Sequence, residues 1–141
     1  MSTRATYKFY GKKPYLTLYI HHDGYPKGAA QYVQNWMGND MENSPHLTVE
    51  KFIRANEKAE ITQSHESHAD TEYRYDFIQM NGEASEAGRF YNEGWKVIVN
   101  ERRWIEDDDF NGIWAGTLDE FVTEHLGGTW LKNEEVANVS G

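Results

Sequence analysis

Cysteine is absent from this 141-residue sequence, and so are long apolar runs. Without cysteine, disulfide bridges, thiolate zinc sites and cysteine nucleophiles are excluded. The longest apolar stretches, such as Val97–Val99, are far shorter than the roughly 20 residues that a transmembrane helix needs. The polar stretch Met1–Tyr10 lacks the apolar segment of a signal peptide, so we expect a cytoplasmic protein that does not bind membranes.

Catalytic signatures with a defined spacing are also missing. The sequence has no G-x-S-x-G nucleophile elbow, no Walker loop and no G-x-G-x-x-G dinucleotide-binding loop. Paired carboxylates are abundant, but an acidic chain supplies many such pairs by chance, so they do not indicate a glycosidase or a protease. These absences favour a binding protein over an enzyme, and we expect no cofactor.

The sequence is instead rich in aromatic and acidic residues. Aromatic residues make up 14% of it, which predicts a core of large rings with polar tips. The net charge is −9 and is unevenly distributed, because residues 1–69 carry a net +1 and residues 70–141 a net −10. An acidic surface repels nucleic-acid phosphates and attracts basic partners. We therefore expect a basic protein or nucleoprotein complex as the partner, without direct contact to nucleic acid.

Residues 1–141 are predicted to form a single α+β domain, in which two to three helices pack on an antiparallel sheet of about four to six strands. Thr3–Tyr10 and Tyr15–His21 have strand patterns separated by a turn, which predicts an antiparallel hairpin. Thr71–Met80 is the clearest strand, because aromatic and polar residues alternate along it. A frayed tail is expected over 132–141.

Three segments carry signals for the start of a helix. Pro26 fits the first position of a helix whose apolar stripe covers Ala29–Met37. Thr48 is expected to cap a second helix that ends near Lys58. Beginning at Thr117, a Thr-x-x-Glu capping box predicts the last helix.

Two clusters of histidine and carboxylate side chains have the composition of a metal site. Imidazole and carboxylate ligands together suit zinc or another divalent metal, and a nearby glutamate could serve as a base. The alternative is structural, with the imidazoles bonded to backbone groups or tyrosine hydroxyls. The first cluster ends the second predicted strand, and the second lies in a polar segment after Ile61. The six candidate ligands are His21, His22, Asp23, His65, His68 and Asp70.

An acidic run with neighbouring aromatic residues is the candidate partner-binding surface. We expect the segment from Glu106 to Gly116 to be an acidic loop. Carboxylates steer the encounter with a basic partner, and large rings supply the desolvated anchors. A solvated loop without a partner is the other interpretation of the same residues. The candidate contact residues are Trp104, Glu106, Asp107, Asp108, Asp109, Phe110 and Trp114.

Four stretches of the first half, including an H-x-D-G-Y-P motif, resemble a group of small uncharacterised bacterial, phage and mobile-element proteins. These stretches are Thr3–Tyr7, Tyr19–Pro26, Phe52–Glu57 and Asp70–Asp76. The resemblance supplies no catalytic residues. It implies a mobile-element context, in which small acidic proteins are similar to anti-CRISPR and anti-restriction inhibitors of host defence.

Two functions from different classes follow as hypotheses. The first is an acidic inhibitor that docks by charge complementarity on the nucleic-acid-binding surface of a host defence complex. The alternative is a metal-dependent hydrolase of a nucleotide or another small molecule, which would use the two histidine clusters.

Overall fold

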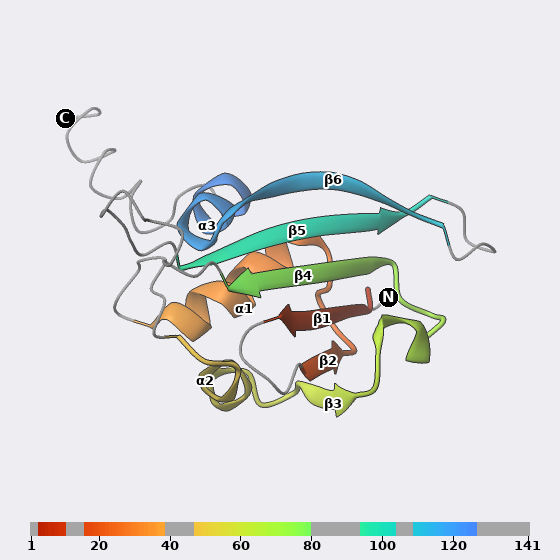
Figure 1. Cartoon of the computed structure of the whole chain (residues 1–141), viewed down its shortest axis with the longest axis horizontal. Coiled ribbons are helices and arrows are strands. Elements are labelled where there is room, and N and C mark those ends of the chain that lie inside the picture. Colours follow the sequence, from red (N-terminus) through yellow and green to blue (C-terminus); the bar gives the residue numbers. More distant parts are fainter. Residues whose placement is uncertain (1–2, 11–15, 39–46, 80–93, 104–108, 127–141) are drawn as a thin grey trace, which may run out of the picture.

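The computed structural model describes residues 3–10, 16–38, 47–79, 94–103 and 109–126. In these ranges six strands form one sheet and three helices cover one of its faces (Figure 1). No helix among them is long and apolar enough to cross a bilayer. In chain order the elements are β1 (Ala5–Tyr10), β2 (Leu16–Ile20), α1 (Pro26–Met37), α2 (Val49–Ala55), β3 (Glu60–Thr62), the 3-10 turn η1 (His65–Ser67), β4 (Tyr73–Gln79), β5 (Trp95–Arg102), β6 (Phe110–Thr117) and α3 (Leu118–His125).

The strand order across the sheet is β3-β2-β1-β4-β5-β6. The predicted hairpin of β1 and β2 is confirmed, and every other neighbouring pair except one is also antiparallel. The exception is β1 with β4, which run parallel. The predicted α+β class is therefore correct, and the sheet is mixed, with mostly antiparallel pairs. The parallel pair has no local sequence signal, because β1 and β4 are far apart in the chain.

Aromatic rings from β1, β4 and the helices form the core, as the composition predicts. Tyr7 of β1 stacks on Tyr75 of β4 with ring centroids 4.9 Å apart. Phe9 meets Trp36 of α1 edge-on at 5.5 Å and Phe52 of α2 at 5.0 Å. Such ring pairs contribute roughly 0.5–1.5 kcal/mol each beyond the burial of their area. The same face of the sheet therefore receives all three helices, since Phe121 of α3 packs on Tyr75 as well.

The predicted helix starts are confirmed, and one predicted end is wrong. Pro26 is the first residue of α1, and the Thr48 side chain caps α2 by accepting from the Lys51 amide. Helix α2 ends at Ala55 and does not reach Lys58. The reason is Asn56, whose buried side-chain amide donates to the Phe52 and Tyr32 carbonyls and so ends the helix.

The predicted loop from Glu106 to Gly116 is wrong over its described C-terminal part, which is strand β6. This segment contains Asn111, Gly112 and Gly116, residue types that disfavour strands, so its composition indicated a loop. Antiparallel pairing with β5 overrides that local preference. The register shifts by one residue between Val99 and Asn100, and the exposed Ile113 occupies the resulting bulge.

Candidate functional site

The H-x-D-G-Y-P motif connects β2 to α1 and is fixed by contacts with β1. Asp23 has a positive φ of 55°, and the next residue, Gly24, donates its amide to Thr3 O at 2.8 Å. A Cβ at Gly24 would lie 2.7 Å from Cβ of Ala5 and 2.9 Å from Thr3 O, so only glycine fits this approach. Pro26 then starts the helix. The most specific motif of the sequence thus has a clear structural role.

The two predicted histidine clusters come together only in part. His21 from the first and Asp70 from the second meet at Tyr19, whose hydroxyl lies 3.3 Å from His21 Nδ1 and donates to Asp70 Oδ2 at 3.2 Å. The ring of His68 stacks on Tyr19 with centroids 3.7 Å apart. At the centre of this group lies Arg4, whose Nε is 3.0 Å from Asp70 Oδ2 and 3.2 Å from His21 Nδ1.

The six candidate ligands do not assemble into the predicted metal centre. Among the described residues, which include all six, no three histidine or carboxylate side chains are placed to hold a metal ion. The guanidinium of Arg4 occupies the point where Asp70 and His21 converge and neutralises that carboxylate. Repulsion from this cation would oppose a divalent ion at the same point. The structure therefore favours the structural interpretation of this cluster.

His65 belongs to a different, buried network on the sheet face opposite the helices. Its Nδ1 lies 2.6 Å from Thr6 Oγ1, and its Nε2 lies 2.9 Å from Asp76 Oδ1. The other carboxylate oxygen of Asp76 accepts from Asn100 at 3.3 Å. A hydroxyl, an imidazole and a carboxylate in series resemble a nucleophile with its base, but Thr6 is fully buried. A substrate cannot reach that hydroxyl, so the network stabilises the sheet.

The predicted acidic run can be placed only at its C-terminal end. Trp104, Glu106, Asp107 and Asp108 lie outside the described residues. Asp109 is exposed, and its carbonyl accepts from the Arg103 amide at 2.9 Å. The ring of Phe110 lies under two guanidinium groups, those of Arg74 at 3.9 Å and Arg102 at 4.6 Å from its centroid. Phe110 therefore already contacts two cations of its own chain.

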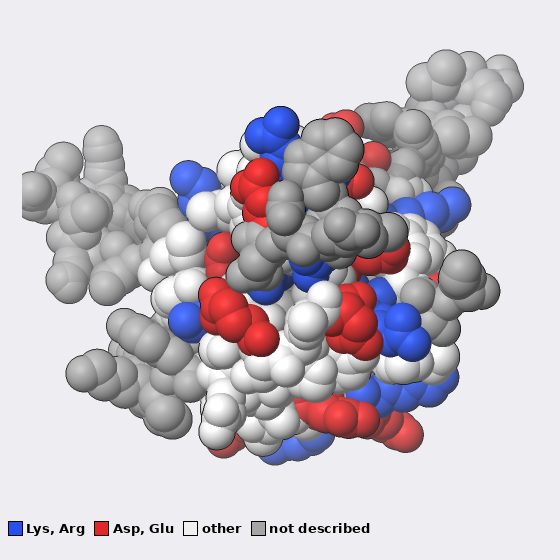
Figure 2. Space-filling model, turned by 90° about the vertical axis from the view of Figure 1, so that its right-hand side faces the viewer, with Lys and Arg blue, Asp and Glu red and all other residues white. Residues whose placement is uncertain are grey.

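Charges of both signs occur side by side at this end of the molecule. Figure 2 shows Lys and Arg interspersed with Asp and Glu on the face that it presents, without one continuous negative region among the described residues. The ion pair of Arg4 with Asp70 and the longer approach of Arg74 to Glu66, at 3.8 Å, are part of this pattern. The described residues at this end therefore carry charges of both signs.

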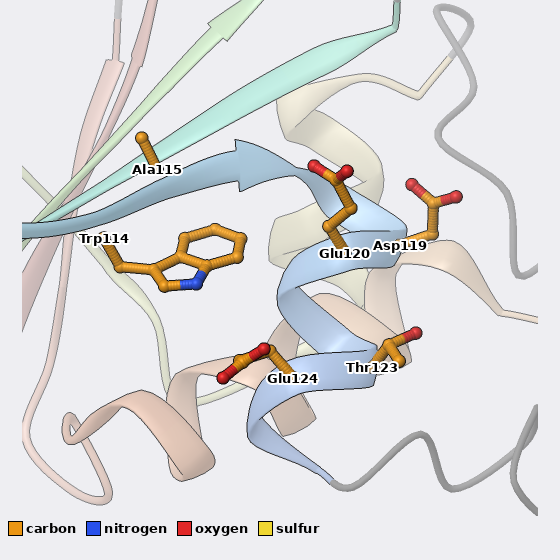
Figure 3. A pocket seen from close by; sticks show the side chains of 6 residues that line it. All are labelled: Trp114, Ala115, Asp119, Glu120, Thr123 and Glu124. Atoms are coloured by element: carbon orange, nitrogen blue, oxygen red, sulfur yellow. The ribbon is translucent and has the colours of Figure 1, made fainter.

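A hollow of about 520 Å³ lies between the end of β6 and α3. Figure 3 shows the indole of Trp114 together with carboxylates of α3 around this space. Of the predicted partner-binding residues, Trp114 is the only described one that lines the hollow. The lining residues are Trp114, Ala115, Asp119, Glu120, Thr123 and Glu124.

The position of the indole depends on its neighbours on β6 and α3. Trp114 is half-buried, with its ring 5.3 Å from that of Phe121 and 5.2 Å from that of His125. The indole extends over Gly116, where an added Cβ would come within 2.6 Å of Cη2 of the ring. The absence of a side chain at Gly116 thus allows Trp114 to form one wall of the hollow.

The carboxylates of the hollow either accept hydrogen bonds from Thr117 or are exposed to solvent. Glu120 accepts from the Thr117 amide at 2.9 Å, and Asp119 accepts from the Thr117 hydroxyl at 2.7 Å. Glu124 is exposed. Within the described part of the chain, none of the three carboxylates forms an ion pair with a Lys or Arg. The capping of α3 therefore orients two of the three carboxylates.

Sequence reasoning found Trp114 and the capping box but did not connect them. The Thr-x-x-Glu pattern predicts a helix start, and the capping box at Thr117 confirms it. The available signal was that Glu124 follows Glu120 by four residues, a spacing that places both on one side of a helix. The position of Trp114 beside them required the β6 strand, which was predicted as a loop.

Comparison of the chain with protein-family models, with curated protein sequences and with solved structures finds no match. The candidate site therefore depends on its own geometry.

Proposed function

We propose that this protein is a binding module that takes a Lys or Arg side chain of a basic partner into the hollow between β6 and α3. The observation that carries the proposal is that three carboxylates and the indole of Trp114 line the same hollow. None of the three carboxylates forms an ion pair with a Lys or Arg among the described residues. A cation placed over an indole face gains roughly 0.5–2 kcal/mol, and adjacent carboxylates add charge-assisted hydrogen bonds.

The partner is proposed to be a protein with a basic, nucleic-acid-binding surface. Such surfaces expose lysine and arginine side chains, and the net charge of −9 would steer the encounter with them. The resemblance to mobile-element proteins makes a host defence complex the proposed biological target, with the module acting as its inhibitor. The docking surface is narrower than the predicted one and is displaced from the acidic run to α3.

The test uses a soluble peptide that alternates arginine and valine as a probe of the hollow. We expect it to shift the NMR signals of the Trp114 indole and of the α3 amides around Glu120 and Glu124. Affinity should fall as salt is raised, because the contact is between charges close to solvent. Glu124→Gln should weaken binding by about fivefold, the loss of one favourable charge contact.

The matched control is Glu57→Gln, which removes the same charge from an exposed turn after α2. It should leave the affinity for the peptide unchanged. Equal weakening by the two substitutions would show that the peptide responds to net charge alone, and the proposal of a specific site would then be wrong. Signals that shift elsewhere, with Trp114 and α3 unaffected, would also contradict it.

A further inference from the structure

We propose that the partner segment binds as an additional strand on the outer edge of β6, which brings its basic side chains to the hollow. This inference rests on the proposed function and names the way in which the partner is held. Its first ground is position, because β6 is the last strand in the sheet order and forms one edge of the sheet (Figure 1). Among the described residues, β6 pairs only with β5.

The outward backbone groups of β6 can be assigned from one contact. Thr117 donates its amide to the side chain of Glu120, at 2.9 Å, which shows that this N–H is directed away from β5. Backbone N–H groups alternate between the two edges of a strand, so Ala115, two residues earlier, presents its N–H to the outer edge as well. Ala115 is exposed and also lines the hollow. An unpaired donor and the acidic hollow therefore lie side by side.

The two edges of the sheet differ in how they resist strand addition. Edge strands are commonly protected by being short, by charged side chains or by proline. The strand at the opposite edge, β3, has three residues and contains Glu60. The eight residues of β6, Phe110 to Thr117, include no charged residue and no proline, and Ile113 is 44% exposed. Only the bulge at Ile113 interrupts the regular ladder, and it lies before the stretch that borders the hollow.

Charge complementarity identifies the occupant as a basic segment of another protein. A strand laid beside Ala115 would pass the three carboxylates of the hollow, so its side chains on that side must be cationic. A second copy of β6 offers none, since its sequence contains no Lys or Arg. Paired copies would also bring two acidic hollows together. Main-chain hydrogen bonds would supply affinity, and the hollow would select lysine or arginine.

The experiment compares Ala115→Pro with Ala115→Val in binding the peptide that alternates arginine and valine. Proline removes the outward N–H and is tolerated where a strand edge faces solvent, whereas valine keeps that donor and suits a strand. We expect Ala115→Pro to weaken binding by about tenfold and Ala115→Val to change it less than about twofold. Hydrogen exchange at the Ala115 amide of the unsubstituted protein should slow when the peptide binds.

A second probe removes any dependence on how Ala115→Pro folds. The same peptide, N-methylated at alternate residues, keeps its charge but cannot pair through one edge, and it should bind the unsubstituted protein about tenfold more weakly. Equal affinity of both peptides, or an Ala115 amide that exchanges as fast in the complex, would overturn the strand addition. The proposed function would then survive if Glu124→Gln still weakened binding, and it would fail with the inference if Glu124→Gln had no effect. A dimer in sedimentation that Ala115→Pro abolishes would assign this edge to a second copy and overturn the inference too.

Discussion

Two groups of polar side chains among the described residues, one at the end of β2 and one at the end of β6, differ in whether their charges are paired. At the end of β2, Asp70 is held by Arg4 and Tyr19, so the group is electrostatically complete. At the end of β6, Asp119, Glu120 and Glu124 line a hollow, and none of them forms an ion pair with a Lys or Arg among the described residues. The first group has the sequence pattern of a metal site but a structural arrangement, whereas the second lines the proposed binding site. If the proposal is right, a dense motif can be fully explained by folding, while unpaired carboxylates beside an aromatic ring indicate the binding site.

The largest loss of stability should come from a side chain added at Gly24, where the H-x-D-G-Y-P motif packs closely against Ala5 and Thr3. Gly24→Ala would force a Cβ against Ala5 and the Thr3 carbonyl, and backbone atoms cannot move aside as a flexible side chain can. We expect a loss of about 3 kcal/mol of unfolding free energy, measured by denaturant titration. Gly112→Ala is the control, because its Cβ would meet only Asn100 Oδ1 at an ordinary 3.5 Å. Equal stability of both variants would contradict a structural role for the motif.

A second test removes hydroxyls from two stacked rings near the same motif. Tyr75 donates its hydroxyl to Gly24 O, whereas the buried hydroxyl of Tyr7 has no hydrogen-bond partner among the described residues. Tyr75→Phe should therefore cost about 1–2 kcal/mol, since it leaves the Gly24 carbonyl unpaired, and Tyr7→Phe should be neutral or stabilising. Thermal unfolding of the two variants measures this difference. The idea that β4 anchors the motif would be wrong if Tyr7→Phe were the more damaging change.

The same two rings predict how stability depends on pH. Burial, as the largest cause, raises the pKa of both Tyr7 and Tyr75 well above the ordinary tyrosine value. In the unfolded chain these phenols ionise near pH 10, so above about pH 10 ionisation favours the unfolded state. Unfolding free energy should be constant on this account below that pH and should fall as the pH rises beyond it. Tyr7→Phe should reduce the fall, and an unchanged alkaline profile would contradict the assignment.

At the other region, Gly116→Ala tests how the hollow is built. The new Cβ would displace the indole of Trp114 or the Glu120 carboxylate. Because the carboxylate can rotate away while the ring is rigid, we expect a stability loss of about 1–2 kcal/mol and a larger relative loss of peptide binding. The Trp114 indole signal in the NMR spectrum reports the displacement directly. Unchanged binding together with a shifted indole would show that Trp114 does not form part of the site.

Patterns among neighbouring residues predict most of the fold. What they miss depends on the pairing of strands from separate parts of the chain. Alternation in Tyr73, Tyr75 and Phe77 and the capping box at Thr117 depend on neighbouring residues, so they were visible in the sequence. Strand β6 was missed because its residues favour a loop until β5 pairs with them. The candidate site required that strand, and only Trp114 of its lining was predicted.

The most direct test of the comparison substitutes one carboxylate from each region and measures two properties. Asp70→Asn removes a partly exposed ion pair with Arg4, so we expect a loss of about 0.5 kcal/mol of stability and no change in peptide affinity. Glu124 lies in the last turn of α3, where its negative charge opposes the negative end of the helix dipole. Glu124→Gln should therefore raise stability by about 0.3 kcal/mol while it weakens peptide binding.

The two regions would be distinguished if Asp70→Asn lowered stability without changing affinity while Glu124→Gln raised stability and weakened binding. A carboxylate that lowers the stability of its own helix but strengthens the binding of a cation is explained by function and not by folding. Calorimetric unfolding and peptide titration on the same two protein samples supply both values. If Asp70→Asn weakened binding as much as Glu124→Gln, the polar group at β2 would belong to the site, and the division drawn between the two regions would be wrong.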